Sequence, residues 1–204
     1  INEASHPEDW KEIYRKIVYW ELTLEGKSEN GMQEVLRTQK GEANNGFSKF
    51  ITQNYASWFS DNSNKPLISP NLFKDKVFPN VNNDENVFFL LLDNLRYDHW
   101  KVLRPLITEL FTIEEEELYY SILPTATQYS RNSLFAGLMP LEISDIYPDI
   151  WLDDEEEGGK NLKEEALLQH QIARFGYDFD FSYNKISHAG TGKKLLQNLS
   201  NLLE

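Results

Sequence analysis

The sequence contains no cysteine in its 204 residues. Disulfide bonds are therefore excluded, and so is any zinc site that is held by thiolates. A metal ion would have to take its ligands from aspartate, glutamate and histidine. The missing cysteines thus narrow the possible metal chemistry to oxygen and imidazole ligands.

Positive charge and long apolar runs are also scarce. Lysine and arginine number 20 against 33 acidic residues, which gives a net charge of −13. A nonspecific polynucleotide binder needs a basic face, so we expect no polynucleotide ligand, although a small nucleotide is not excluded because a metal can supply positive charge locally. No apolar run approaches the length of a membrane span, and the N-terminus lacks a signal-peptide pattern. We therefore expect a cytoplasmic protein without membrane insertion.

Both ends of the chain suggest a fragment. The sequence starts at Ile1 without a methionine, and it ends inside a predicted helix over 192–204 that has no C-terminal stop signal. We therefore expect further sequence before Ile1 and after Glu204.

The spacing of apolar residues predicts helices in the first 80 residues. Apolar residues recur at helical spacing over 10–18, and Gly26 ends this pattern. A shorter helix is expected around 32–36 and a third over 47–59, where aromatic residues form one stripe. Such stripes are usually core, so we predict a helical bundle that buries these rings.

An irregular connection is expected over 60–86, which holds three prolines and many Asn and Asp residues. We place a domain boundary near residue 80. Two domains follow from this, a helical bundle or linker domain over 1–80 and a second domain over 81–204.

The second domain shows an α/β pattern. The continuous apolar run 87–92 is typical of a strand that is covered on both faces. A helix is expected over 97–111, a second strand over 118–122 and a second helix over 127–137. Alternating strands and helices predict a parallel sheet with right-handed crossovers.

The remainder of the second domain adds one more strand. Residues 153–159 form an acidic loop that we expect to be solvated. A helix is predicted over 162–175, and the alternation over 177–183 predicts a strand. About three strands are few for such a sheet, so we expect the sheet to continue in sequence outside this chain.

Candidate functional residues lie where the first two strands should end. Asp93 follows the first strand, and Thr125 and Thr127 follow the second. Ligands of open α/β sheets gather at the carboxyl ends of the strands, so these side chains should face one crevice. At a helix start Thr127 could hold a phosphate, and metal coordination could activate its hydroxyl for attack on phosphorus. The alternative is structural, because Thr and Asp at these positions often only cap a helix.

The same residues carry a resemblance to a known family. Asp93 and Arg96 match an Asp-x-x-Arg element, Pro124, Thr125 and Thr127 match a Pro-Thr-x-Thr element, and the following small-residue-plus-Gly element falls at 136–137. These motifs resemble the PglZ branch of the alkaline phosphatase superfamily. Nucleotide pyrophosphatases share the skeleton but continue differently after the second threonine, and sulfatases use another nucleophile motif.

The order of the predicted domains resembles PorX-type response regulators, in which a receiver domain precedes a helical bundle and a PglZ domain. The resemblance implies a two-zinc phosphodiesterase or phosphatase acting on nucleotide phosphoesters, with Asp93 as a zinc ligand and Thr127 as nucleophile and zinc ligand. The further ligand motifs of the superfamily do not occur over 138–204. His170 lies in a predicted helix and fits no such motif. His188 follows a predicted strand and is considered as a site residue, with a glycine-rich turn as the preferred explanation of that stretch. We therefore expect this chain by itself to bind zinc weakly or not at all and to be inactive.

Other functions stay open at this point. Arg96 and Arg131 could contact a phosphate or could form structural salt bridges. The resemblance also implies protein partners of a signalling, transcription or type IX secretion system, and a dimer could form through the helical bundle. A non-catalytic signalling and interaction module is thus the alternative to an enzyme, and a catalytically dead scaffold is a third possibility.

Overall fold

The computed structural model describes residues 1, 3–27, 31–60, 65–81, 86–152 and 157–202. They form two compact units, which we treat separately. The first unit contains residues 1–66 and 90–118, and the second contains 67–89 and 119–204. In the described parts of the chain, no helix combines the length and apolar character that crossing a membrane requires.

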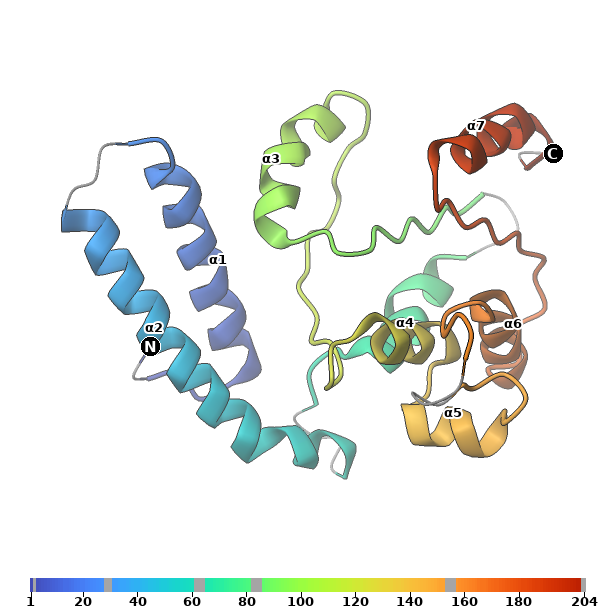
Figure 1. The fold of residues 1–204 in the computed structure, drawn as a ribbon, viewed down its shortest axis with the longest axis horizontal. Coiled ribbons are helices and arrows are strands. Elements are labelled where there is room, and N and C mark those ends of the chain that lie inside the picture. The colour runs from blue at the N-terminus through green and yellow to red at the C-terminus, as the bar shows by residue number, and fades with distance from the viewer. Residues whose placement is uncertain (2, 28–30, 61–64, 82–85, 153–156, 203–204) are drawn as a thin grey trace. The chain divides into compact units, whose positions relative to one another are not determined.

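Helices build the first unit. Helix α1 spans Pro7–Leu24 and helix α2 spans Gly31–Asn54, followed by a short 3₁₀ helix, η1, over Tyr55–Phe59. Figure 1 shows α1 and α2 as an antiparallel pair. Helix α3 spans Tyr97–Thr108, with Pro105 inside it, and contacts α1. The helical character predicted for this region is confirmed.

A close approach between α1 and α2 depends on one glycine. A Cβ atom at Gly46 would lie 2.7 Å from the ring of Trp10, which is itself buried. The Trp10 ring packs against Phe47 and Phe50, with ring centroids 5.6 and 5.8 Å apart. The two helices predicted around 32–36 and 47–59 are in fact mainly one helix, α2. The separation was wrong because the polar stretch between the two apolar groups continues the helix, and Gly46 within it serves close packing.

Glu116 fixes α3 to the extended segment that follows it. Its carboxylate accepts hydrogen bonds from the Tyr97 hydroxyl at 2.9 Å, the Trp100 indole at 2.8 Å and the Lys101 ammonium at 2.7 Å. The Arg104 guanidinium lies 3.5 Å away. Burial alone would raise the pKa of Glu116, but the hydrogen bonds outweigh it and lower the pKa to about 2.

We expect Glu116→Gln to destabilise the first unit in a pH-dependent way. The folded pKa lies below the unfolded value of 4.5, so the stabilisation is complete above about pH 4.5 and is lost as pH falls towards 2. The variant should be less stable than wild type by about 2 kcal/mol at pH 7, and the difference should shrink towards pH 2. Urea unfolding at several pH values measures this, with the exposed Glu114→Gln as control. An equal loss at pH 7 and pH 2 would contradict the charge-based explanation.

The second unit is built from helices of different length. Over 69–80 lie three short turns, η2 (Ser69–Asn71), η3 (Phe73–Val77) and η4 (Phe78–Asn80). The longer elements are α4 (Thr127–Ala136), α5 (Pro140–Ile146), α6 (Glu164–Arg174) and α7 (Ala189–Asn198), and η5 (Leu199–Leu202) follows α7. Figure 1 shows α4, α5 and α6 grouped together, and α4 contacts both α5 and α6. The sequence predicted α4 and α6 but missed α5 and the short turns.

The core of the second unit includes a segment that the sequence analysis treated as an irregular connection. Ile68, Phe73 and Phe78 are buried. The Phe73 ring lies 5.8 Å from that of Phe135 on α4, and the Phe78 ring lies 5.0 Å from that of Tyr177. Prolines and asparagines therefore mark tight turns here and do not mark a solvated linker.

The predicted parallel sheet is absent from the described residues, which are mostly helical. A single parallel bridge joins Ile68 to Tyr120, with hydrogen bonds from the Tyr120 amide to the Leu67 carbonyl (2.9 Å) and from the Ser69 amide to the Tyr120 carbonyl (3.1 Å). Residues 87–92 and 177–183 form no strand. The α/β prediction for this domain, with its parallel-sheet alkaline-phosphatase-like fold, is therefore wrong for this part of the chain.

The physical reason lies in backbone pairing. A strand exists only where a neighbouring segment supplies partners for its amides and carbonyls, and an apolar pattern says nothing about that neighbour. Leu90 and Leu92, expected to be covered on both faces, are 83% and 60% exposed. The domain boundary predicted near residue 80 stays a prediction.

Three expectations reach residues outside the described ranges. Positions 61–64 and 82–85 of the predicted irregular connection, 153–156 of the predicted acidic loop and 203–204 of the predicted C-terminal helix are not described. Within the described part, the last helix begins earlier than predicted, at Ala189, and no residue of α7 is buried.

Candidate functional site

The motif over 123–137 starts a helix as the sequence predicted. Thr127 is the first residue of α4, after Ala126 in an extended conformation. The helix ends at Gly137, whose φ of 62° is left-handed. A Cβ atom there would also lie 2.1 Å from the amide of Gln171, which is fully buried, so only glycine fits.

The hydroxyl of Thr127 does not cap α4. The cap position belongs to Ala126, and no side chain makes a capping hydrogen bond there. Thr125 and Thr127 are both exposed. The first amides of a helix lack partners within the helix, and together with the helix dipole they favour an anion. The capping alternative for Thr127 is therefore not what the structure describes.

Asp93 lies in a tight turn. It follows the extended run 87–92, and the next residue, Asn94, adopts a left-handed φ of 60°. Asparagine tolerates this conformation better than most residues. The turn leads into α3 and leaves Asp93 exposed.

Asp93 belongs to the first unit and Thr127 to the second. The sheet that was expected to bring them to one edge is absent from the described residues. The prediction that they share one crevice therefore stays a prediction. Across the described residues there is also no group of three or more His, Asp or Glu side chains able to hold a metal ion. These residues alone do not fit a complete zinc centre.

Both arginines singled out by the sequence form ion pairs. The Arg96 side chain bonds the carboxylate of Asp98, with Nε 3.0 Å from Oδ1, and this hydrogen bond lowers the pKa of Asp98. The Arg131 guanidinium lies 2.7 and 2.8 Å from the two carboxylate oxygens of Glu164, whose side chain is fully buried. For both residues the salt-bridge interpretation is the one that the structure describes.

Glu164 gathers two further groups. The Tyr183 hydroxyl donates a hydrogen bond of 2.5 Å to it, and the Lys185 ammonium lies 3.0 Å away. Burial, reinforced by the hydrogen bond to Glu164, raises the pKa of the Tyr183 phenol. The phenol therefore stays protonated and acts as a hydrogen-bond donor to the carboxylate. This buried carboxylate ties α4 and α6 to the segment around 183–185.

Asparagines support the first turn of α4. The Asn161 amide donates to the backbone carbonyl of Thr127 at 3.3 Å and to the Asn132 side-chain oxygen at 3.1 Å. In return, the Asn132 amide donates to the carbonyl of Lys160 at 3.0 Å. Residues 160–164 thus form a strap along α4, and we use this name below.

The two histidines considered as ligands have structural contacts. His188 precedes α7, and its Nδ1 accepts a hydrogen bond of 3.1 Å from the Gly190 amide. This hydrogen bond engages Nδ1 at the start of α7. The His170 ring stacks on Tyr147 with centroids 4.5 Å apart.

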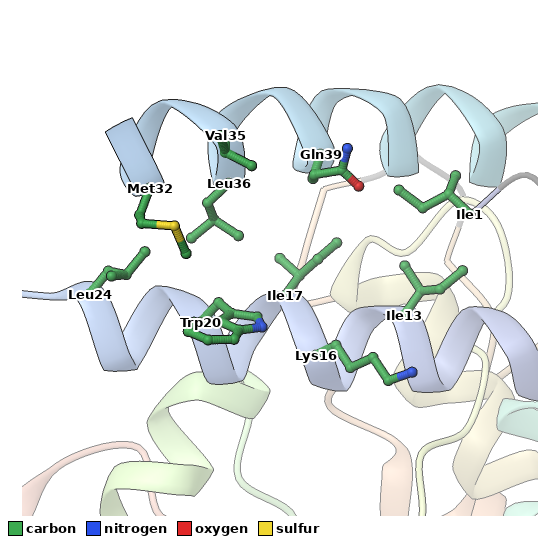
Figure 2. Close-up of a pocket in the computed structure, with 10 residues that line it drawn as sticks. All are labelled: Ile1, Ile13, Lys16, Ile17, Trp20, Leu24, Met32, Val35, Leu36 and Gln39. Atoms are coloured by element: carbon green, nitrogen blue, oxygen red, sulfur yellow. The ribbon is translucent and has the colours of Figure 1, made fainter. Parts of the chain in front are cut away.

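The aromatic stripe over 47–59 is only partly buried. Phe50 and Trp58 are buried, whereas Phe59 is 41% exposed and Lys65 lies over its ring at 5.9 Å. A groove of about 340 Å³ is lined by residues of both α1 and α2. Figure 2 shows its mostly apolar lining, which is contributed by Ile1, Ile13, Lys16, Ile17, Trp20, Leu24, Met32, Val35, Leu36 and Gln39. The predicted dimer through this bundle stays a prediction.

Sequence reasoning missed Asn161 and Glu164. Their spacing, an Asn followed three residues later by a Glu at a helix start, is typical of a capping box. That pattern directs the glutamate to its own helix start, but here it turns to Arg131 instead. Its partner Arg131 lies 33 residues away, so no local signal indicated it.

Two family models match the chain. Residues 72–201, more than half of the chain, match the BREX system PglZ alkaline phosphatase-like domain. The chain therefore belongs to the PglZ family. Residues 1–59 match the PorX response regulator linker domain, and this order of domains is that of a PorX-type response regulator. The resemblance that the motifs indicated is thus confirmed. No curated protein matches the chain.

Proposed function

We propose that the PglZ part of this regulator hydrolyses phosphoesters of the nucleotide type with Thr127 as the nucleophile. The proposal rests on the exposure and the position of the Thr127 hydroxyl. This hydroxyl is exposed at the first position of α4, and the capping position is occupied by Ala126. Membership of an alkaline-phosphatase-like family and the match of the Pro-Thr-x-Thr element support the same assignment.

The proposed reaction has two displacements at phosphorus. The Thr127 Oγ1 loses its proton to solvent and forms a bond to phosphorus, while the bond from phosphorus to the leaving oxygen breaks and that oxygen is protonated. Water then attacks the phosphothreonine, and the Thr127 hydroxyl is restored. The positive end of the α4 helix dipole would stabilise negative charge on the phosphoryl oxygens.

Zinc is the cofactor that we propose for the full-length protein, with Asp93 and Thr127 among its ligands. Zinc bound to a hydroxyl would favour loss of its proton. The described residues do not form a complete metal centre. The reaction steps above therefore involve only groups of the chain itself, the substrate and water. What this chain contributes under the proposal is one carboxylate and the nucleophile.

The covalent intermediate provides the test. Full-length protein turning over bis(4-nitrophenyl) phosphate and quenched in acid should carry a nitrophenyl phosphate on the peptide that contains Thr127. Mass spectrometry detects the adduct. It should be absent from Thr127→Val and present in Thr125→Val, because Thr125 lies outside the helix. Turnover without any adduct on Thr127 would refute the assignment.

A further inference from the structure

We propose that Asn161 is a positioning residue for Thr127. It would hold the first turn of α4 so that the Thr127 hydroxyl keeps one direction. This inference rests on the proposed function, and it adds a residue from the strap, 34 positions away in the sequence.

The contact is made to the backbone of Thr127 and not to its hydroxyl. The Asn161 amide donates to the Thr127 carbonyl at 3.3 Å. A carbonyl has two lone pairs, so this bond adds to the hydrogen bonding of the helix and does not compete with it. The hydroxyl stays exposed for a substrate while the backbone that carries it is restrained.

The start of α4 needs outside support because it lacks a side-chain cap. Helix ends without a side-chain cap fray. Inside the turn, the Ala126 carbonyl accepts hydrogen bonds from the amides of Tyr129 and Ser130, both at 3.0 Å. The strap supplies a bond of another kind, from the Asn161 amide to the Thr127 carbonyl, which restrains the first turn without pairing its amides.

The strap is anchored at its buried side. Asn132, which accepts the second hydrogen bond from Asn161, is only 5% exposed, and Glu164 is 1% exposed. The Lys185 ammonium donates to the Asn161 carbonyl at 2.6 Å and also reaches Glu164. Asn161 is thus fixed through both its side chain and its main chain, so it can transmit this rigidity to Thr127.

Positioning of this kind affects turnover more than binding. A displacement of about 1 Å at a reacting group can slow a reaction on the order of 100-fold. In the full-length protein, Asn161→Ala should lower kcat for bis(4-nitrophenyl) phosphate by about 10-fold, with KM within about twofold. Hydrogen exchange of the peptide over 126–131 should become faster. Lys163→Ala, an exposed change in the same strap, is the matched control and should alter neither quantity.

The exchange and turnover measurements each support or overturn the positioning role of Asn161. Unchanged exchange over 126–131 in Asn161→Ala overturns the proposal, because the strap would then not restrain α4. Faster exchange with unchanged kcat also overturns it, as does an equal loss of kcat in Lys163→Ala. If Thr127→Ala loses turnover while Asn161→Ala does not, only the positioning role fails. If Thr127→Ala keeps full turnover, the proposed function itself fails.

Discussion

Thr127→Ala should lower the turnover of a phosphodiester substrate by at least ~10³-fold in the full-length protein. Without the hydroxyl, the covalent path is closed and water must attack phosphorus directly. Folding should be preserved, because exposed substitutions away from special features change stability by less than about 0.5 kcal/mol, and Thr127 is exposed and makes no capping bond. Initial rates with bis(4-nitrophenyl) phosphate and a thermal unfolding curve test both statements.

Two further variants separate the nucleophile from its surroundings. Thr127→Ser keeps a hydroxyl and should retain measurable turnover, reduced because serine lacks the methyl group that restricts χ1. Thr125→Val removes the other exposed hydroxyl of the motif and should reduce turnover far less than Thr127→Ala. Wild-type turnover in Thr127→Ala would exclude Thr127 as the nucleophile, whereas an absence of turnover in the wild-type protein itself would favour the non-catalytic signalling module.

Helices were predictable here because their signals are local. Pro7 and the acidic residues after it start α1, and Gly137 ends α4 with a left-handed conformation. These features act within one or two turns of the chain, so one sequence suffices to recognise them. The same holds for α3, where the helix pattern survives Pro105.

The sheet was not predictable from the same kind of signal. Tyr120 pairs with Leu67 and Ser69, which lie in the stretch that the sequence analysis treated as an irregular connection. The partners of a strand are distant in sequence. The alternation over 177–183 indicates which side chains could share one face of a strand, but it does not indicate which segment would pair with that strand. Strand propensity and an alternating apolar pattern can therefore predict a strand in a segment that has no pairing partner among the described residues.

The residues of the candidate site also differ in whether a local signal in the sequence indicates them. Thr127 was found because it stands in a contiguous motif at a helix start. Glu164 was missed because its importance comes from burial beside Arg131 and Tyr183, which are far from it in sequence. Residues that act through local chemistry are visible in one sequence, whereas those that act through packing need coordinates.

Glu164→Leu should destabilise the second unit strongly, by roughly 3–5 kcal/mol. The carboxylate side chain is fully buried, and its removal leaves the largely buried guanidinium of Arg131 without its counter-charge. Urea unfolding measures the loss of stability, and hydrogen exchange of α4 and α6 shows where protection is lost. Glu165→Gln, one residue further along the same helix start but exposed, should stay within about 0.5 kcal/mol of wild type.

The double variant Glu164→Leu, Arg131→Met identifies the cause of that loss. If the loss comes from an unpaired buried charge, removing the arginine as well should recover part of the stability, because apolar replacement of a whole buried ion pair is often neutral. Lys185 is 38% exposed in its side chain and can turn to water, so it should not prevent recovery. A double variant at least as unstable as the sum of the two single changes would show that shape, and not charge pairing, makes Glu164 necessary.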